Sequence, residues 1–284
     1  MEHFYLIANP SKEGTRETAK QITQYLHGHG ATCEGSPQLR RREGEGYGYT
    51  DVENIPPKTQ CVITLGGDGT LIQAARDLVN LQIPLLGINM GTLGYLTQIS
   101  RGEAIVPMLD ALMADNYRLE RRMMINGRIT GGAKEYQGIA LNDIVLTRKD
   151  VMQVLKIQVF VNDEFLNEYT ADGMIVSTPT GSTAYNLSAG GPIVTPGAEL
   201  MVLTPICSHS LNARSIVVSA HDRVRLKVAR DAFQKQMVVF DGDRVVDISC
   251  GESLEIVRSE SDTKLIKLKN VSFLDNLRNK MARV

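Results

Sequence analysis

The chain has 284 residues, of which 43% are hydrophobic and 22% charged, and its formal net charge is −1. These values fit a soluble globular protein of one large or two ordinary domains, and they give no general electrostatic support for nucleic-acid or anionic-membrane binding. No apolar run approaches the roughly 20 residues of a membrane span, and the N-terminus lacks a signal peptide. The four cysteines lie far apart without a C-x-x-C pair, so we expect reduced thiols in a cytoplasmic protein.

The first hundred residues alternate predicted strands and helices. Helical spacing occurs over 13–28 and again over 71–78. Residues 32–34 predict a weak strand, and the glycine-rich stretch 36–58 predicts an irregular loop. Buried strands are predicted by three continuous apolar runs, 4–8, 61–65 and 84–88. Because these runs do not alternate with polar residues, they favour a parallel sheet that is covered on both faces.

Three predicted loops leave the same edge of this sheet, the edge beyond the carboxyl ends of the strands where ligands bind. They are residues 9–12, 66–70 and 89–95. Residues 66–70 read Gly-Gly-Asp-Gly-Thr, and their glycines expose backbone N–H groups to which a polyphosphate can come close. The N-terminus of the following helix would point at the same anion. Asp68 is a negative charge among groups that attract anions, which indicates chemistry on a hydroxyl or a metal ion. An ordinary turn aspartate is the alternative.

The pattern changes from about residue 117. Apolar residues alternate with polar ones at 155–161, 224–228 and 254–256, which predicts antiparallel strands. Residues 161–165 predict a hairpin turn. This mainly β region runs to about residue 270. The last segment, 273–283, is again helical in spacing, and we expect it to return to the first domain.

A second motif lies within the β region, where residues 178–192 read T-P-T-G-S-T-A-Y-N-L-S-A-G-G-P. Hydroxyl and backbone groups can satisfy base edges and ribose oxygens, while Tyr185 offers a flat face for stacking. A nucleotide pocket is therefore one interpretation. A helix capped by Ser or Thr, with a core tyrosine, is the other, and the local sequence does not decide between them.

Together these motifs resemble the NAD kinase family of the bacterial type, nearly from end to end. The loop at 66–70 is shared with lipid kinases, so the segment 178–192 is what identifies the family. The other matches are G-x-L-G-Y-L at 91–96, L-N-D at 141–143, D-G at 172–173, H-S-L-N-x-R at 209–214 and Asp241-Gly242. The resemblance implies an enzyme that transfers the γ-phosphate of ATP to the 2′-hydroxyl of the adenosine ribose of NAD.

The fold implied is α/β plus all-β. A Rossmann-like parallel α/β domain at 1–100 would bind phosphate, and a larger antiparallel β domain at 101–270 would bind NAD. The C-terminal segment 271–284 would return to the first domain. Asp172 matches a residue that, in this family, can reach NAD across a subunit interface, so the resemblance also implies a homodimer or homotetramer.

The resemblance assigns the site residues position by position, with Asp68 matching the proposed general base for the 2′-hydroxyl. The residues expected around the ATP phosphates are Gly66, Gly67, Gly69 and Thr70. The residues expected to contact NAD are Asp68, Gly69, Tyr95, Asn142, Asp143, Asp172, Thr180, Thr183, Ala184, Tyr185, Asn186 and Ser188. Two positions depart from the family, since Asp143 replaces a glutamate and Thr170 replaces a basic residue of some relatives. His209 and Arg214 match a family segment and are either ligand contacts or structural.

The implied substrates are NAD and ATP, with no nucleic-acid or membrane partner. A divalent metal ion, Mg²⁺ above all, is expected to be held mainly by the substrate phosphates, and no protein metal site is predicted. Few lysines lie near the motifs, so backbone N–H groups and the metal are expected to carry most of the phosphate charge. Two other functions share these features. One is a lipid or other alcohol kinase, although such relatives usually carry a glutamate where this chain has 71–75. The other is a non-catalytic dinucleotide-binding or sensing protein.

Overall fold

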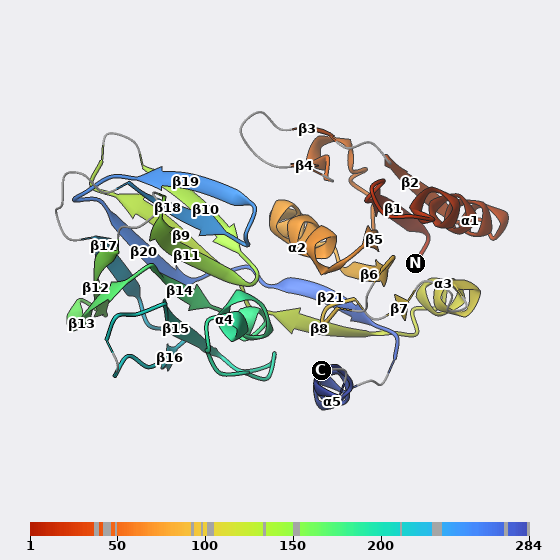
Figure 1. The fold of residues 1–284 in the computed structure, drawn as a ribbon. Helices are drawn as coiled ribbons and strands as arrows, with labels where there is room; N and C mark the ends of the chain where they lie inside the picture. Colours follow the sequence, from red (N-terminus) through yellow and green to blue (C-terminus); the bar gives the residue numbers. More distant parts are fainter. Residues whose placement is uncertain are drawn as a thin grey trace. The chain divides into compact units, whose positions relative to one another are not determined.

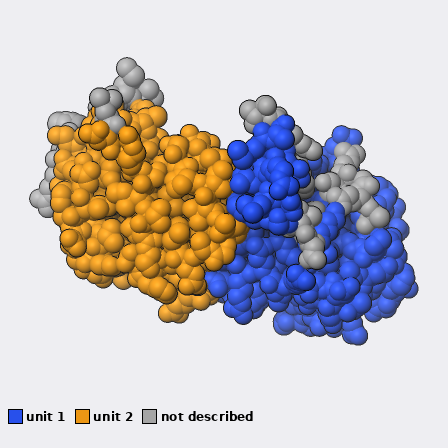
Figure 2. All heavy atoms as spheres, turned by 90° about the horizontal axis from the view of Figure 1, so that it is seen from below, with its two compact units in different colours: residues 1–122, 262–284 blue, residues 123–261 orange. Residues whose placement is uncertain are grey.

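The computed structural model describes residues 1–36, 40–41, 47–48, 50–91, 94–97, 99–100, 105–132, 135–149, 154–210, 212–228, 235–269 and 272–282. The chain forms two compact units (Figure 2). Unit 1 comprises Met1–Arg122 and Asp262–Val284, and unit 2 comprises Met123–Ser261. The resemblance implied other bounds, with domains at 1–100 and 101–270 and a returning segment at 271–284. The boundaries differ because two strands near them, β8 (Arg118–Arg122) and β21 (Thr263–Lys267), belong to the sheet of unit 1.

Unit 1 is built on a mixed sheet in the order β2-β1-β5-β6-β21-β8, with β7 also pairing with β6 (Figure 1). Its remaining strands are β1 (His3–Ala8), β2 (Thr32–Ser36), β5 (Cys61–Gly66), β6 (Leu85–Asn89) and β7 (Ile99–Ser100). The first four strands in the order run parallel, as does β21 beside β6, whereas β8 is antiparallel to β21. The three buried strands predicted from apolar runs are confirmed as β1, β5 and β6.

The described helices of unit 1 differ in burial, since the first three bury apolar side chains and the last buries none. They are α1 (Thr15–Gly28), α2 (Asp68–Asp77), α3 (Ile105–Met113) and α5 (Phe273–Met281), with turns η1 (Val52–Asn54) and η2 (Val79–Leu81). Helix α1 buries Ile22 and Leu26 in the cluster that includes the strand residues Leu6 and Ile63. In the predicted loop 36–58, residues 50–58 are irregular apart from η1, and β3 (Arg40–Arg41) pairs with β4 (Tyr47–Gly48). Residues 37–39, 42–46 and 49 lie outside the described residues.

The first residues of helices α2 and α5 are set by side chains at their N-termini. Helix α2 begins at Asp68, three residues before the predicted start, after Gly67 in an extended conformation. A carboxylate in the first turn is favoured by the helix dipole, and this offsets the poor helix propensity of the neighbouring glycine. Helix α5 begins with a capping box, in which Ser272 and Asp275 exchange side-chain and backbone hydrogen bonds.

Unit 2 consists of two antiparallel sheets. One has the order β10-β9-β20-β17-β12-β13 and the other β16-β15-β14-β11-β18-β19. The strands are β9 (Ile125–Thr130), β10 (Tyr136–Ala140), β11 (Asp143–Arg148), β12 (Leu155–Val161), β13 (Glu164–Ala171), β14 (Gly173–Ser177), β15 (Leu200–Ile206), β16 (Ile216–Ser219), β17 (Val224–Val228), β18 (Gln236–Phe240), β19 (Arg244–Ile248) and β20 (Ser253–Arg258). After β14 the chain forms η3 (Gly181–Thr183) and the short helix α4 (Tyr185–Ser188).

The core of unit 2 lies between these sheets, because alternate residues of both sheets share one apolar cluster. Ile144 and Val176 come from one sheet, and Ile157 and Leu254 from the other. The predicted hairpin at 161–165 is confirmed. Asn162 and Asp163 both have positive φ, as a two-residue turn between antiparallel strands requires.

Candidate functional site

The carboxylate of Asp68 is held by the segment 94–97. It accepts backbone N–H groups from Tyr95 at 2.7 Å, Leu96 at 3.3 Å and Thr97 at 3.1 Å, and the Thr97 hydroxyl at 2.9 Å. A carboxylate has about four lone-pair positions, so these four donors use its accepting capacity. The orientation of Asp68 is therefore set by its neighbours before any ligand binds.

Close approach of this segment to Asp68 depends on Gly94. A Cβ atom at position 94 would lie 2.0 Å from Asp68 Oδ1 and 2.1 Å from Oδ2, which no real side chain permits. By contrast, a Cβ atom at Gly67 or Gly69 would meet nothing within 4 Å. No packing in the described structure requires glycine at these two positions, and a ligand that approaches the backbone would supply the reason.

The three predicted loops of unit 1 meet through side-chain hydrogen bonds. Asn89 donates to the Thr97 hydroxyl at 2.9 Å, and through it reaches Asp68. The amide of Asn9 donates to Thr70 Oγ1 at 3.5 Å. Thr70 is 3% exposed, its backbone N–H donates to Gly67 O at 3.1 Å, and its hydroxyl oxygen accepts from Asn9. Its contact with the ATP phosphates stays a prediction. The sequence did not single out Thr97, and residues 92–93 of this loop lie outside the described residues.

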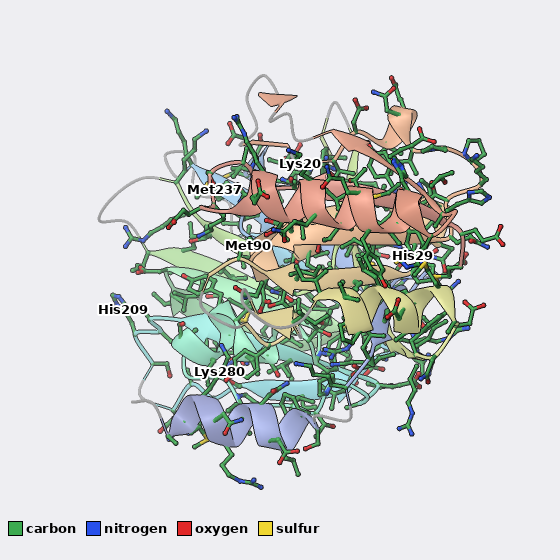
Figure 3. The ribbon with its side chains drawn as sticks, turned by 90° about the vertical axis from the view of Figure 1, so that its right-hand side faces the viewer. Lys20, His29, Met90, His209, Met237 and Lys280 are labelled. Carbon is green, nitrogen blue, oxygen red and sulfur yellow. The ribbon has the colours of Figure 1, made fainter. Side chains whose placement is uncertain are left out.

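Tyr95 lies in unit 1 beside α5. Lys280 belongs to this helix (Figure 3), and its ammonium lies 4.3 Å from the centre of the Tyr95 ring. Partial burial raises the pKa of the Tyr95 phenol. The ring lines a cavity of about 430 Å³ together with residues of β8, β21 and α5. The sequence analysis placed Tyr95 at the dinucleotide pocket, and the structure adds this basic neighbourhood.

In unit 2, Asp241 organises the L-N-D motif. Its carboxylate accepts backbone N–H groups from Leu141 at 2.9 Å, Asn142 at 2.7 Å and Asp143 at 3.3 Å. The sequence analysis quoted Asp241 only as a family match and gave it no role. Asn142 Oδ1 is buried and has no hydrogen-bond partner among the described residues, which is costly unless a ligand supplies a donor.

Asp143 is 4% exposed, and its carboxyl group has an unusual pKa. Burial, and then the charge of Asp241, raise that pKa from 3.8 to about 7. A carboxyl group in this range can donate a hydrogen bond as well as accept one near neutral pH.

The 178–192 segment packs directly onto the L-N-D motif. Thr178 donates through its hydroxyl to Leu141 O at 2.6 Å, and a Cβ atom at Gly181 would lie 2.1 Å from Asn142 O. Tyr185 is 46% exposed, so the alternative of a core tyrosine is wrong. Neither η3 nor α4 has a side-chain cap, which also argues against a simple capped helix.

The expected NAD contacts of this segment divide by exposure. Tyr185 and Ser188 are exposed, and Thr183 and Ala184 are half-buried. Thr180 is 5% exposed. Asn186 is fully buried, and its amide donates to Ser182 O and Pro192 O while accepting from the Thr204 hydroxyl. These bonds show that the Asn186 side chain supports the segment, and its contact with NAD stays a prediction.

Asp172 is paired with Arg148 of β11. Arg148 Nε lies 3.0 Å from Asp172 Oδ1, and its Nη2 donates to Oδ2 at 3.0 Å, so the pair is bidentate. The sequence analysis noted that Thr170 lacks the basic side chain of some relatives. A guanidinium is nevertheless present here, from Arg148, which no sequence motif singled out. Partial burial raises the pKa of Tyr185, and the charges of Cys207, Asp143 and Asp172 add to this effect, so these residues share one environment.

The described residues include no group of three or more His, Cys, Asp or Glu side chains that could hold a metal ion. In the same described part of the chain, no helix is long and apolar enough to cross a membrane.

Fold and site together define a nucleotide-binding protein with one α/β unit and one antiparallel β unit. The chain belongs to the ATP-NAD kinase family, since residues 4–117 match the model of the ATP-NAD kinase N-terminal domain and residues 141–268 match that of the C-terminal domain.

Curated relatives and solved structures agree with this assignment. The chain is 42% identical over 285 residues to the NAD kinase of Agathobacter rectalis, covering 99% of both chains. It is 39% identical over 294 residues to the NAD kinase of Lachnospira eligens, covering 99% of this chain and 100% of that one. Yeast NADH kinase in complex with NADH has a TM-score of 0.82 at 25% identity, over 98% of this chain and 86% of that chain. An Archaeoglobus fulgidus NAD kinase in complex with ATP has a TM-score of 0.77 at 24% identity, over 99% of both chains, and shows the shared fold.

Proposed function

We propose that the chain is an ATP-dependent NAD kinase, which transfers the γ-phosphate of ATP to the 2′-hydroxyl of the adenosine ribose of NAD to form NADP. Family membership over both units supports this activity. The structural observation that carries the proposal is the setting of Asp68. It is an oriented carboxylate in the first turn of α2, beside Gly67 and Gly69, whose Cα atoms face open space.

In this proposal Asp68 is the general base that accepts the proton of the reacting 2′-hydroxyl. The bond between ribose O2′ and the γ-phosphorus forms, the bond between that phosphorus and the bridging oxygen breaks, and ADP leaves. The hydroxyl proton passes to Asp68 as the new bond forms. Rotation of the Thr97 hydroxyl would free one lone pair of Oδ1 for this proton, while the three backbone N–H donors keep the carboxylate in place.

The binding of NAD is assigned to unit 2. The buried Asn142 Oδ1 calls for a donor such as an amino or hydroxyl group, and the exposed Tyr185 offers a stacking face. Asp143 is one methylene shorter than the family glutamate, so a bridging water to the ribose is part of the proposal.

The proposal includes Mg²⁺ carried mainly by the substrate phosphates, because the described residues form no carboxylate cluster that would hold it alone. When bound, this ion would neutralise phosphate charge. It also includes a homodimer or homotetramer in which Asp172 reaches the NAD of a neighbouring subunit, which sedimentation analysis would test. A reducing, cytoplasmic setting is supported by the four free cysteines, Cys33, Cys61, Cys207 and Cys250.

The test is purified protein with ATP, Mg²⁺ and NAD, read through an NADP-specific dehydrogenase, beside Asp68→Asn. We expect NADP from the wild type and a kcat lower by about 10²–10⁴ in the variant, with NAD affinity within a few fold. A folded protein that binds NAD but forms no NADP would instead be a non-catalytic dinucleotide sensor. A large change in metal requirement in Asp68→Asn would assign that residue to metal binding.

A further inference from the structure

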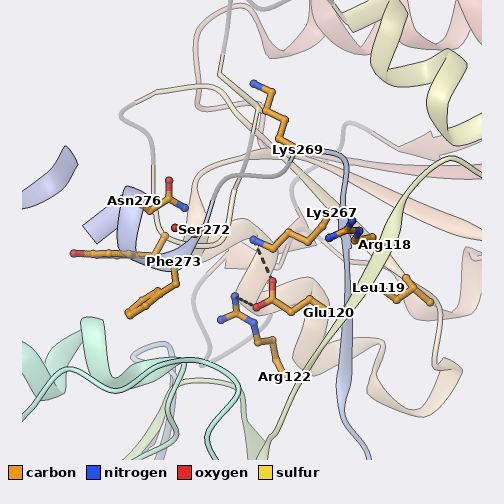
Figure 4. A pocket seen from close by; sticks show the side chains of 10 residues that line it. Arg118, Leu119, Glu120, Arg122, Lys267, Lys269, Ser272, Phe273 and Asn276 are labelled. Atoms are coloured by element: carbon orange, nitrogen blue, oxygen red, sulfur yellow. Dashed lines mark ion pairs between the residues drawn. The ribbon is translucent and has the colours of Figure 1, made fainter. Parts of the chain in front are cut away.

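A cavity of about 430 Å³ in unit 1 has four basic side chains among the ten residues that line it (Figure 4). Two of them, Arg118 and Arg122, belong to β8. Lys267 is the last residue of β21, a strand distant in sequence, and Lys269 follows two residues later. Glu120 is the acidic residue of the lining. Four cations against one anion leave an excess of positive charge in a confined space.

Strand pairing explains why these side chains converge. Residues 118, 120 and 122 alternate onto one face of β8, and the register sets Arg118 opposite Lys267. Like charges directly opposite each other destabilise a sheet. Glu120 binds Arg122 at 2.9 Å and Lys267 at 3.1 Å, so its single charge is already shared (Figure 4). An anion in the cavity would relieve the remaining repulsion.

Burial and charge shift the pKa values of two residues that line this cavity, Glu120 and Arg122. Burial raises the pKa of Glu120, but the charges and hydrogen bonds of Arg122 and Lys267 outweigh this and hold it below its ordinary value. Arg122 is 4% exposed, and burial lowers its pKa against the opposing effects of Glu120 and Asp68. A guanidinium remains charged under these conditions, so Arg122 presents a poorly hydrated positive charge.

Two residues of the cavity lining interact with Asp68. Tyr95 lines it, and the backbone N–H of the same residue donates to Asp68 at 2.7 Å. Arg122 also lines it and lies within electrostatic range of the Asp68 carboxylate. Both links fall within unit 1.

We infer that this basic cavity binds the polyphosphate chain of the phosphate donor, an inference that rests on the proposed kinase function. Guanidinium groups bind phosphate oxygens in bidentate fashion, and ammonium groups add point charges. Because lysines are scarce near the motifs, the sequence predicted that backbone N–H groups and a metal ion balance the phosphate charge. The fold supplies the missing cations from β8 and β21.

The test compares Arg118→Gln with Arg121→Gln, which lies on the same strand and is absent from the cavity lining. Both positions are exposed, so neither variant should unfold, and thermal unfolding checks this. Loss of one charged hydrogen bond should raise the KM for ATP about tenfold in Arg118→Gln, with an unchanged KM for NAD and no effect in Arg121→Gln. Lys269→Gln is a second variant with the same expected direction.

Direct binding separates this inference from the kinase proposal. Calorimetric titration with ATP and with inorganic tripolyphosphate needs no turnover, and Arg118→Gln should weaken both ligands by about tenfold. Weakening of ATP alone would assign the cavity to the nucleoside, and a raised KM for NAD would assign it to the acceptor. Either result, or equal effects of Arg118→Gln and Arg121→Gln, would overturn the inference. A protein that binds tripolyphosphate but forms no NADP would contradict the proposed kinase function and leave the inference about the cavity in place.

Discussion

The Thr97 hydroxyl donates to Asp68 Oδ1 at 2.9 Å and accepts from Asn89 Nδ2 at the same distance. Because Thr97 is 3% exposed, water does not compete for the two hydrogen bonds by which its hydroxyl connects Asn89 with Asp68. In Thr97→Val the shape is nearly kept, but Asn89 loses its acceptor and Asp68 one donor. The hydroxyl rotates away only as the proton is transferred, so its loss leaves Asp68 less well oriented before the reaction. We therefore expect kcat to fall about tenfold, with the KM for NAD unchanged.

Thr97→Ser is the matched control, since it keeps the hydroxyl and loses only a methyl group. It should restore most of kcat, whereas a purely structural role would lower stability in both variants and leave kcat per folded molecule unchanged. Steady-state kinetics and urea unfolding of the two proteins distinguish these cases.

Gly94→Ala should disable the site through the same carboxylate. The new Cβ would lie 2.0–2.1 Å from the Asp68 oxygens, so either the side chain or the segment 94–97 must move. Overpacking of this kind costs about 1–3 kcal/mol of stability, and a misplaced reacting group costs about 10² in rate. Gly28→Ala is the control, because a Cβ there meets nothing within 4 Å, and its kcat should match the wild type. Equal activity of the two variants would show that the segment 94–97 moves without disturbing Asp68, and would contradict this prediction.

The sequence predicted those parts of the fold that have a local signature. Continuous apolar runs identified β1, β5 and β6, and alternation identified β12 and β17. Strand β8 was missed as a member of the first sheet because 118–122 reads R-L-E-R-R, with little apolar content. Its partner β21 lies at the other end of the chain, and no local pattern reveals pairing over such a separation. Both unit boundaries and the basic cavity follow from this one pairing.

The site was predicted from motifs, and motifs combine ligand-binding residues with supporting ones. Asp68 is oriented by hydrogen bonds, Asn142 has a buried oxygen without a partner among the described residues, and the Tyr185 ring is exposed. Asn186 belongs to the same motif, yet its side chain is consumed by internal hydrogen bonds. Burial separates these roles, and burial depends on tertiary structure.

Asp241→Asn should loosen the L-N-D motif. The aspartate accepts three backbone N–H groups, whereas an amide would turn its own NH₂ toward some of these donors. Leaving a buried N–H without an acceptor costs about 1–3 kcal/mol, so we expect that loss in urea unfolding and a raised KM for NAD. Asp247→Asn, on the same hairpin but at an exposed ion pair, is the control and should change stability by less than about 1 kcal/mol. If the two variants are equally stable, Asp241 does not organise this loop.

The Asp143 carboxyl should make stability depend on pH. Its pKa is raised from 3.8 to about 7 by burial and by Asp241, so the folded state holds a proton that the unfolded state has released. The stabilising contribution of the neutral carboxyl is therefore fully present below pH 3.8 and is lost as pH rises toward 7, at up to about 1.4 kcal/mol per pH unit. Asp143→Asn cannot ionise and lacks this loss. Urea unfolding of both proteins between pH 5 and pH 8 should show the variant gaining on the wild type up to about pH 7, with a constant difference above it. A difference that does not change with pH would mean that Asp143 is ionised in the folded protein throughout.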